Sequence, residues 1–171
     1  MLIAIYGPSR AGKDSVAGFL VKNYGFEQRN FATPIRDTLL KIYDNLRPDI
    51  SQDVRDHGWD YVKAKYVESV ESMITLGQSM RDLNPRIWLD AAFIDSYTDL
   101  VIPDVRQPNE AKEILQRGGE IWKIERPSVQ QHRGMDGILD SYVTFDAHII
   151  NDRSLTDLEN IVDQIMQSRV F

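Results

Sequence analysis

The 171-residue sequence predicts an α/β fold, a three-layer sandwich in which helices cover both faces of a five-stranded parallel sheet. Short apolar runs alternate with segments of helical period, as in parallel sheets whose strands are joined by helical crossovers. A glycine-rich turn separates the first apolar run from the first helix. No repeat, low-complexity tract or long linker divides the chain, so residues 1–171 are expected to form a single domain.

The first elements are a strand, a helix and a weaker second strand. Leu2–Tyr6 is an apolar run that Gly7 and Pro8 stop. Lys13–Tyr24 follows with a helical period, and Gly25 ends it. Phe26–Phe31 is predicted as the second strand, although its centre is polar.

A long helical segment follows. Thr33 before Pro34 is typical of a helix N-cap followed by proline in the first turn. The pattern stays helical from about residue 47 to about residue 97, and the break at Asn84 separates two predicted helices, Tyr66–Leu83 and Pro85–Tyr97. We therefore expect a helical insertion at about residues 47–97, between the second and third strands.

The second half of the chain returns to alternating strands and helices. Its predicted strands are Leu100–Ile102, Glu120–Glu125 and Ala147–Ile150. A helix over Pro108–Arg117 precedes the second of these, and a capping-box pattern at Ser154–Asp157 opens a final helix. About residues 126–146 lack a clear period and are expected to form a second insertion, a lid. A rigid sheet with two inserts suits an enzyme that closes over its ligand.

Composition excludes several classes of function. The net charge of −6 is a poor match for nonspecific nucleic-acid binding, which needs a basic surface. The absence of cysteine excludes disulfides, zinc–thiolate sites and a cysteine nucleophile. No apolar run approaches the length of a membrane span, and the N-terminal run is too short for a signal peptide. We expect a cytoplasmic protein with neither nucleic acid nor membrane as a partner.

The strongest motif is the stretch Gly7-Pro-Ser-Arg-Ala-Gly12-Lys13, which matches the start of the phosphate-loop (P-loop) pattern. Glycines let the backbone curl so that successive N–H groups face phosphate oxygens, and the following helix adds its positive end. Lys13 would reach the β- and γ-phosphates of ATP. The loop residues expected to bind the nucleotide are Gly7, Ser9, Arg10, Ala11, Gly12, Lys13, Asp14 and Ser15. An ordinary glycine turn is the alternative.

The loop departs from the usual pattern after the lysine, where Asp14 replaces the serine or threonine that normally binds Mg²⁺. Ser15 follows it. Because Mg²⁺ accepts carboxylates well, Asp14 is a candidate metal ligand, either directly or through water.

A second group of candidates follows the predicted strand Leu100–Ile102. Asp104 would lie at the carboxyl end of that strand, beside the phosphate loop, as a catalytic and metal-binding carboxylate. Asp104 is also a candidate substrate ligand, together with Arg106, Asn109 and Glu110, which follow it closely. Asn109 and Glu110 would equally serve as first-turn residues of the next helix.

Phosphoryl transfer also needs cations, and guanidinium groups match phosphate oxygens well. Arg36 and Arg81 are candidate substrate ligands in the helical part of the chain. Arg126, at the start of the lid, and Arg133, inside it, are candidate catalytic residues. For each arginine the alternative is a solvated surface charge.

Several stretches in this order resemble the deoxynucleoside monophosphate kinases of tailed bacteriophages, within the nucleoside monophosphate kinase-like P-loop proteins. The matching stretches are Gly7–Ser15, Phe31–Arg36, Leu76–Arg81 with Asn84–Trp88, Asp104–Ala111, Arg126-Pro127 and Ile149–Asp152. The resemblance implies a P-loop NTPase fold and transfer of the ATP γ-phosphate to a monophosphate, with Mg²⁺. It also implies that the helical insertion holds the monophosphate and that Asn151 lies near the adenine of ATP. A phage enzyme would work in the host cytoplasm.

Other functions remain open at this point. The same loop would serve a dephospho-coenzyme A or phosphomevalonate type of kinase, or a module that binds ATP without catalysis. A nucleic-acid-stimulated ATPase fits the acidic charge least well. Sequence does not separate a monomer from a homodimer, nor does it set the preferred base or sugar.

Overall fold

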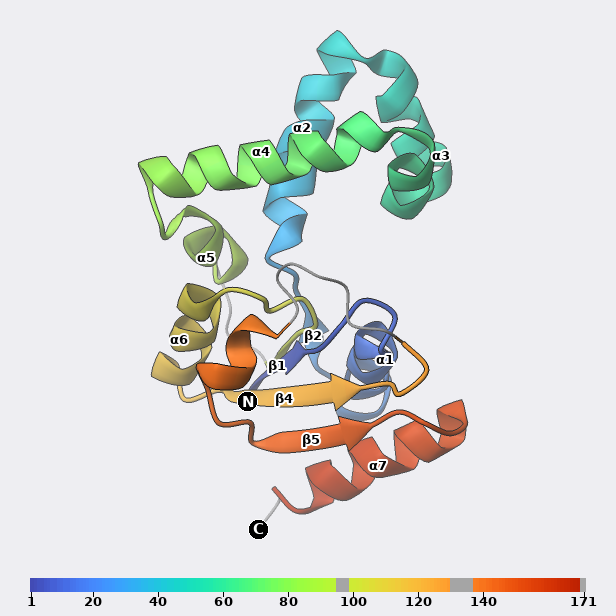
Figure 1. Cartoon of the computed structure of the whole chain (residues 1–171), viewed down its shortest axis with the longest axis vertical. Coiled ribbons are helices and arrows are strands. Elements are labelled where there is room, and N and C mark those ends of the chain that lie inside the picture. The colour runs from blue at the N-terminus through green and yellow to red at the C-terminus, as the bar shows by residue number, and fades with distance from the viewer. Residues whose placement is uncertain (95–98, 130–136, 170–171) are drawn as a thin grey trace. The chain divides into compact units, whose positions relative to one another are not determined.

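The computed structural model of the chain describes residues 1–94, 99–129 and 137–169. The chain divides into two compact units. We call Met1–Asn30 with Asp95–Phe171 the sheet unit, and Phe31–Ile94 the helical unit. Figure 1 shows the elements of each.

The sheet unit is built on five parallel strands in the order β2-β3-β1-β4-β5. The strands are β1 (Leu2–Tyr6), β2 (Glu27–Gln28), β3 (Leu100–Ile102), β4 (Glu120–Glu125) and β5 (Ala147–Ile150). In the centre, Ala4 of β1 lies opposite Ile102 of β3 and Ile121 of β4. Because all strands run in one direction, the segments that follow them meet at one edge. This sheet confirms the predicted fold class.

Helices cover both faces of this sheet. Helices α1 (Lys13–Tyr24) and α7 (Leu155–Gln167) pack together over one face, in a core with Ile3, Ile5 and Trp122. Helix α6 (Pro108–Gln116) packs against β1 and β4 on the other face. Alternation along β1 explains the division, since successive side chains of a strand point to opposite faces.

The helical unit contains α2 (Ala32–Leu46), α3 (Pro48–Lys65), α4 (Val67–Leu83) and α5 (Ile87–Ala92). Its core is a cluster from α2 and α3, namely Leu39, Tyr43, Ile50, Val54 and Val62. Gly58 interrupts the helical backbone of α3 with φ +81° and ψ 171°. Trp88 of α5 donates its indole N–H to the carbonyl of Gly77 in α4, at 3.0 Å.

Most predicted boundaries in the sheet unit are confirmed, and those in the helical unit are less accurate. Thr33 is not an N-cap, because α2 begins at Ala32, two residues before the predicted start at Pro34, and its N-cap is Phe31. The ring of Phe31 is buried and contacts Phe93 edge-on at 6.1 Å, so tertiary packing sets the helix start. The second strand spans only Glu27–Gln28, since the polar stretch around it offers little apolar surface to bury.

Two further differences concern α3 and α5. Helix α3 was not predicted as a separate element, because Gly58 breaks its apolar period. Helix α5 begins at Ile87, after a turn in which Asn84 Oδ1 accepts the N–H of Arg86 at 3.0 Å. It ends at Ala92, short of the predicted Tyr97, and residues 95–98 lie outside the described residues.

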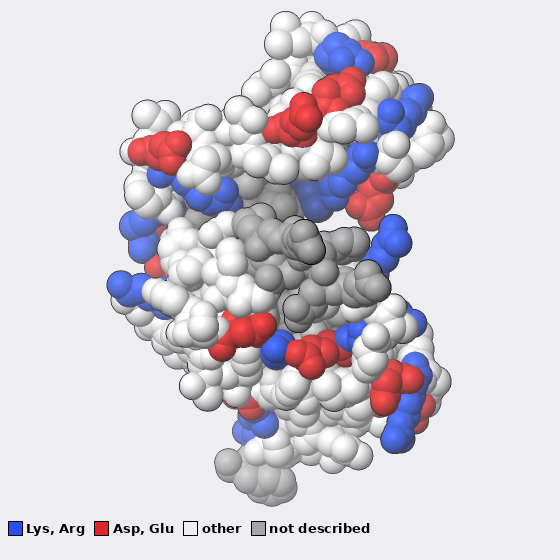
Figure 2. Space-filling view, in the orientation of Figure 1, with Lys and Arg blue, Asp and Glu red and all other residues white. Residues whose placement is uncertain are grey.

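Surface charges of both signs are interspersed on the visible face of each unit (Figure 2). Exposed ion pairs in the helical unit join Arg47 to Asp49 at 2.9 Å and Lys65 to Asp53 at 2.7 Å. Among the residues that the structure describes, no helix has the length and apolar character needed to cross a membrane.

Candidate phosphate-binding site

The loop from Gly7 to Gly12 joins the carboxyl end of β1 to the first residue of α1, Lys13. It therefore lies at the edge of the sheet where the segments after β3, β4 and β5 also emerge. The N-terminus of α1 opens directly from the loop. Unpaired N–H groups and a partial positive charge gather at such a helix end, which makes it suited to binding anions.

Two glycines of this loop are required by close packing. Gly7 has φ +155°, and a Cβ at this position would lie 2.2 Å from the carbonyl oxygen of Ile124 in β4. Gly12 has φ +110°, and its Cβ would lie 2.5 Å from Nδ2 of Asn151. Arg10 also takes a positive φ, +64°, which is uncommon for a residue with a side chain. The loop thus follows a curled path that other residues at 7 and 12 would disrupt.

Lys13 is buried, with its ammonium group folded over the loop. Its Nζ donates hydrogen bonds to the carbonyl oxygens of Gly7, at 2.8 Å, and Pro8, at 2.7 Å. A buried ammonium group requires such partners to offset its loss of hydration. The structure therefore places the predicted catalytic lysine against the concave backbone of the loop.

Three oxygen-bearing side chains accompany the loop. Asp14 lies exposed in the first turn of α1, Ser15 is half-buried, and Ser9 is exposed. Carboxylate and hydroxyl oxygens are suited to Mg²⁺, which usually takes one or two carboxylates together with phosphate oxygens. Within the described ranges, no three His, Cys, Asp or Glu residues gather closely enough to hold a metal by themselves. The donor set fits a metal that is shared with a phosphate ligand.

In the segment after β3, Asp104 is half-buried in a turn at the same edge of the sheet. Glu110 is 4% exposed, and its Oε2 accepts the backbone N–H groups of Arg106, at 2.8 Å, and Gln107, at 3.0 Å. Glu110 is thus a helix-capping residue of α6. Arg106 is exposed and Asn109 is half-buried. The ligand roles of all four residues stay predictions.

The segments after β4 and β5 form a small cleft of about 180 Å³. Its lining residues are Arg126, Pro127, Ser128, Asn151, Asp152 and Arg153. The main chain joins the two segments where the N–H of Asn151 donates to the carbonyl of Glu125 at 2.8 Å. Asn151 also donates from Nδ2 to the carbonyl of Ala11, at 2.8 Å, so the cleft adjoins the phosphate loop.

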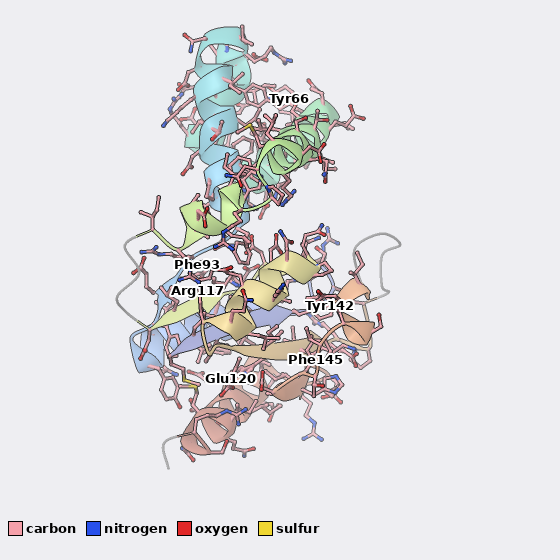
Figure 3. All side chains as sticks on the ribbon, turned by 90° about the vertical axis from the view of Figure 1, so that its left-hand side faces the viewer. Tyr66, Phe93, Arg117, Glu120, Tyr142 and Phe145 are labelled. Carbon is pink, nitrogen blue, oxygen red and sulfur yellow. The ribbon has the colours of Figure 1, made fainter. Side chains whose placement is uncertain are left out.

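Sequence reasoning missed a cluster around Tyr6, the last residue of β1. The ring of Tyr6 stacks on that of Phe145, which is labelled in Figure 3, with 5.6 Å between the ring centroids. The hydroxyl of Tyr6 accepts a hydrogen bond from the N–H of Gly137 at 2.6 Å. Burial raises the pKa of Tyr6. Phe145 follows η1 (Ile138–Ser141), so this cluster ties the end of the predicted lid segment to the strand that feeds the phosphate loop.

Lys123 belongs to the same cluster. Its Nζ lies 2.6 Å from Glu125 and 2.8 Å from Asp140 of η1. Burial acts to lower the pKa of Lys123, but hydrogen bonds to Asp140 and Glu125 outweigh it and raise the pKa. A lysine flanked by Trp122 and Ile124 in the middle of β4 was the signal in the sequence for such a partly buried ionic contact.

In the helical unit, Arg36 of α2 and Arg81 of α4 are both half-buried. The Arg81 guanidinium covers Gly77, where an added Cβ would lie 3.3 Å from Nη1 and 3.3 Å from the side chain of Ile35. The Nε of Arg36 is buried and lacks a hydrogen-bond partner within the described part of the chain. Such a donor is costly to leave unsatisfied, which suits a group that binds an anion.

Of the two predicted lid arginines, Arg126 lies among the described residues and Arg133 does not. Arg126 is exposed and lines the cleft after β4.

Comparison of the sequence with known proteins gives two matches. The family model described as "Deoxynucleotide monophosphate kinase" matches residues 1–68. A protein of Acanthamoeba polyphaga mimivirus described as "Putative deoxynucleotide monophosphate kinase" is 24% identical over 178 residues, which cover 92% of this chain and 91% of the viral protein.

The solved structures that resemble this chain include two kinases of low sequence identity. Shikimate kinase from Aquifex aeolicus aligns over 100% of this chain and 99% of its own, with a TM-score of 0.49 and 11% identity. The APS kinase CysC of Mycobacterium tuberculosis aligns over 97% and 96%, with a TM-score of 0.44 and 15% identity. The assignment of the fold rests on the five-stranded parallel sheet. The two sequence matches confirm the resemblance to deoxynucleotide monophosphate kinases that the motifs indicated, and they support a kinase, that is, a phosphotransferase.

Proposed function

We propose that the chain transfers the γ-phosphate of ATP to a deoxynucleoside or nucleoside monophosphate, giving the diphosphate. The observation that carries this proposal is the phosphate loop, whose path is fixed by Gly7 and Gly12 and over which the buried ammonium of Lys13 is folded. The two sequence matches support the choice of a nucleoside monophosphate as acceptor.

The donor would bind along the carboxyl edge of the sheet. Its phosphates would lie in the loop, against the N-terminus of α1 and Lys13. Its adenine and ribose suit the cleft between the segments that begin at Arg126 and Asn151, because that cleft adjoins the loop. Asp14 and Asp104 would hold Mg²⁺, which when bound would offset charge on the phosphate oxygens.

The acceptor would bind through the arginines of the helical unit. Arg36 and Arg81 would hold the phosphate of the monophosphate. The Nε of Arg36, which has no hydrogen-bond partner among the residues that the structure describes, supports this role. In the sheet unit, Arg106 and Asn109 are proposed substrate ligands.

The reaction would be an in-line attack by an acceptor phosphate oxygen on the γ-phosphorus. This oxygen is already ionised at neutral pH, so the attack requires no strong general base. Catalysis would come from positioning and from charge stabilisation by Lys13, Arg126 and Arg133. The ATP β–γ bond breaks as the new bond forms, and ADP leaves.

A coupled ADP-release assay with Mg-ATP tests the proposal. We would compare the deoxy- and ribonucleoside monophosphates with dephospho-coenzyme A and phosphomevalonate. We expect turnover on at least one nucleoside monophosphate. Turnover on another acceptor alone would retain the P-loop kinase and discard the substrate assignment, and ATP binding without any turnover would indicate a binding module.

The viral relative supports the proposal that the enzyme works in the cytoplasm of an infected host cell. The sequence left a monomer and a homodimer open, and analytical ultracentrifugation would distinguish the two.

A further inference from the structure

Asn151 connects the end of β5 to the phosphate loop, although the two lie 140 residues apart in the chain. Its Nδ2 donates to the carbonyl oxygen of Ala11 at 2.8 Å. Ala11 is fully buried, so without this donor a buried carbonyl would lose a partner. Asn151 is itself held in place by its backbone N–H, which donates to Glu125 of β4 at 2.8 Å.

The packing around Gly12 shows how closely Asn151 fits the loop. A Cβ on Gly12 would lie 2.5 Å from Nδ2 of Asn151 and 3.3 Å from Cδ1 of Ile124. The glycine therefore leaves the space that the Asn151 amide occupies. Glycine is thus needed at position 12 for two reasons: the loop conformation, and the space that the Asn151 side chain fills.

The geometry of the peptide bond links this contact to anion binding. In a trans peptide the C=O and N–H groups point in opposite directions. Because Asn151 draws the carbonyl of Ala11 toward β5, the N–H of Gly12 in the same peptide must point away from Asn151. In a curled glycine loop, inward N–H groups of this kind form the anion-binding surface.

We propose that Asn151 is a positioning residue for phosphate binding: it fixes the peptide between Ala11 and Gly12 so that the Gly12 N–H faces the polyphosphate of the nucleotide. This inference rests on the proposed function and deepens it. It differs from the role of an adenine ligand that the resemblance implies for Asn151, because a positioning residue acts on the phosphates whatever base they carry.

The test compares a ligand with a base and a ligand without one. Binding of ATP and of inorganic tripolyphosphate, each with Mg²⁺, would be measured by titration calorimetry on the wild type and on Asn151→Ala. We expect the affinity for both ligands to fall by a similar factor, about five- to tenfold, as for the loss of one hydrogen bond. The melting temperature of each protein would be recorded alongside.

Asn23→Ala is the matched control, because Asn23 also forms a long-range side-chain bond, from Nδ2 to Glu159 at 2.9 Å, but away from the loop. It should leave both affinities unchanged. Asn151→Asp is a second variant of the same size, in which a carboxylate would face the Ala11 carbonyl, and it should weaken binding of both ligands at least as strongly.

The outcomes separate this inference from the proposed function. Loss of affinity for ATP alone, with tripolyphosphate unaffected in both Asn151 variants, would overturn the positioning role in favour of a base contact. Unchanged affinity for both ligands would overturn it as well. If the wild type bound neither ligand, the proposed function itself would fail.

Discussion

In the proposed function, the sheet unit and the helical unit would offer hydrogen-bond donors to phosphate in different ways. In the sheet unit these donors would be backbone N–H groups and one buried ammonium, on a backbone that Gly7, Gly12 and Asn151 contact or shape. In the helical unit they would be the guanidinium groups of Arg36 and Arg81, on side chains of α2 and α4. A loop whose backbone is fixed suits the polyphosphate, which every nucleoside triphosphate shares. Side chains on helices can instead differ according to the acceptor substrate.

The two units also hold their charged groups differently. In the sheet unit, Lys123 is mostly buried and pairs with two carboxylates at the base of η1. In the helical unit, the ion pairs that join Arg47 to Asp49 and Lys65 to Asp53 lie at the surface. Exposed pairs contribute little to stability, so we expect the chemistry of the helical unit to tolerate changes in them.

The largest effect is expected from removing the buried ammonium group of Lys13 in the sheet unit. Lys13→Ala should lower kcat by about 1,000-fold, because the charge that offsets the transferring phosphate is lost. The coupled ADP-release assay measures this, and a circular dichroism spectrum like that of the wild type would show that the fold is retained. A variant with near-normal turnover would contradict the kinase assignment.

The next prediction tests the backbone of the same loop. Gly12→Ala should weaken ATP binding by about 100-fold, because a side chain at φ +110° is strained and collides with Asn151. Gly18→Ala, on the exposed face of α1 with open space around the added methyl group, is the control. It should leave binding unchanged and stabilise the protein by about 0.5–1 kcal/mol. Equal effects of the two substitutions would remove the special role of Gly12.

A smaller effect is expected from the side-chain donors of the helical unit. Arg36→Met and Arg81→Met should each raise KM for the monophosphate by about 30-fold, as for the loss of a charged hydrogen bond, and leave KM for ATP unchanged. Arg55→Met, which removes an exposed ion pair with Asp44 and a hydrogen bond to Ser51, is the control and should change neither constant. An equal rise in KM for ATP would contradict the division of labour between the two units.

The smallest effect concerns the surface of the helical unit. Hydrogen bonds from Lys65 and Tyr66 lower the pKa of Asp53 below its ordinary value of 3.8. The stabilisation from this shift is present above that value and is lost as the pH falls below it. In Asp53→Asn, the urea midpoint should therefore fall less between pH 7 and pH 3 than in the wild type.

Asp60→Asn is the control for that measurement, because Asp60 is 99% exposed and pairs only weakly with Lys63 at 3.2 Å. It should keep the pH dependence of the wild type. If the urea midpoint of Asp53→Asn also fell with pH as in the wild type, the contacts of Asp53 would not contribute measurably to stability.

Prediction from sequence succeeded where local chemistry alone sets the structure. β1, β3, β4 and β5 and helix α1 span the predicted residues, because apolar runs and glycines set their ends. The capping box at Ser154 is present, with Asp157 N–H donating to the serine hydroxyl at 3.2 Å. Prediction failed at Thr33, where the buried Phe31 moved the helix start, and at α3, where Gly58 concealed the period.

The sequence by itself determined the class of fold, the phosphate loop and the resemblance to a kinase family, because each depends on residues close together in the chain. Only the tertiary structure decided which distant groups meet the loop. The contacts of Asn151 with Ala11 and of Tyr6 with Gly137 join residues more than 130 positions apart. Sequence spacing carries no information on such contacts, since the order of strands in the sheet brings these segments together.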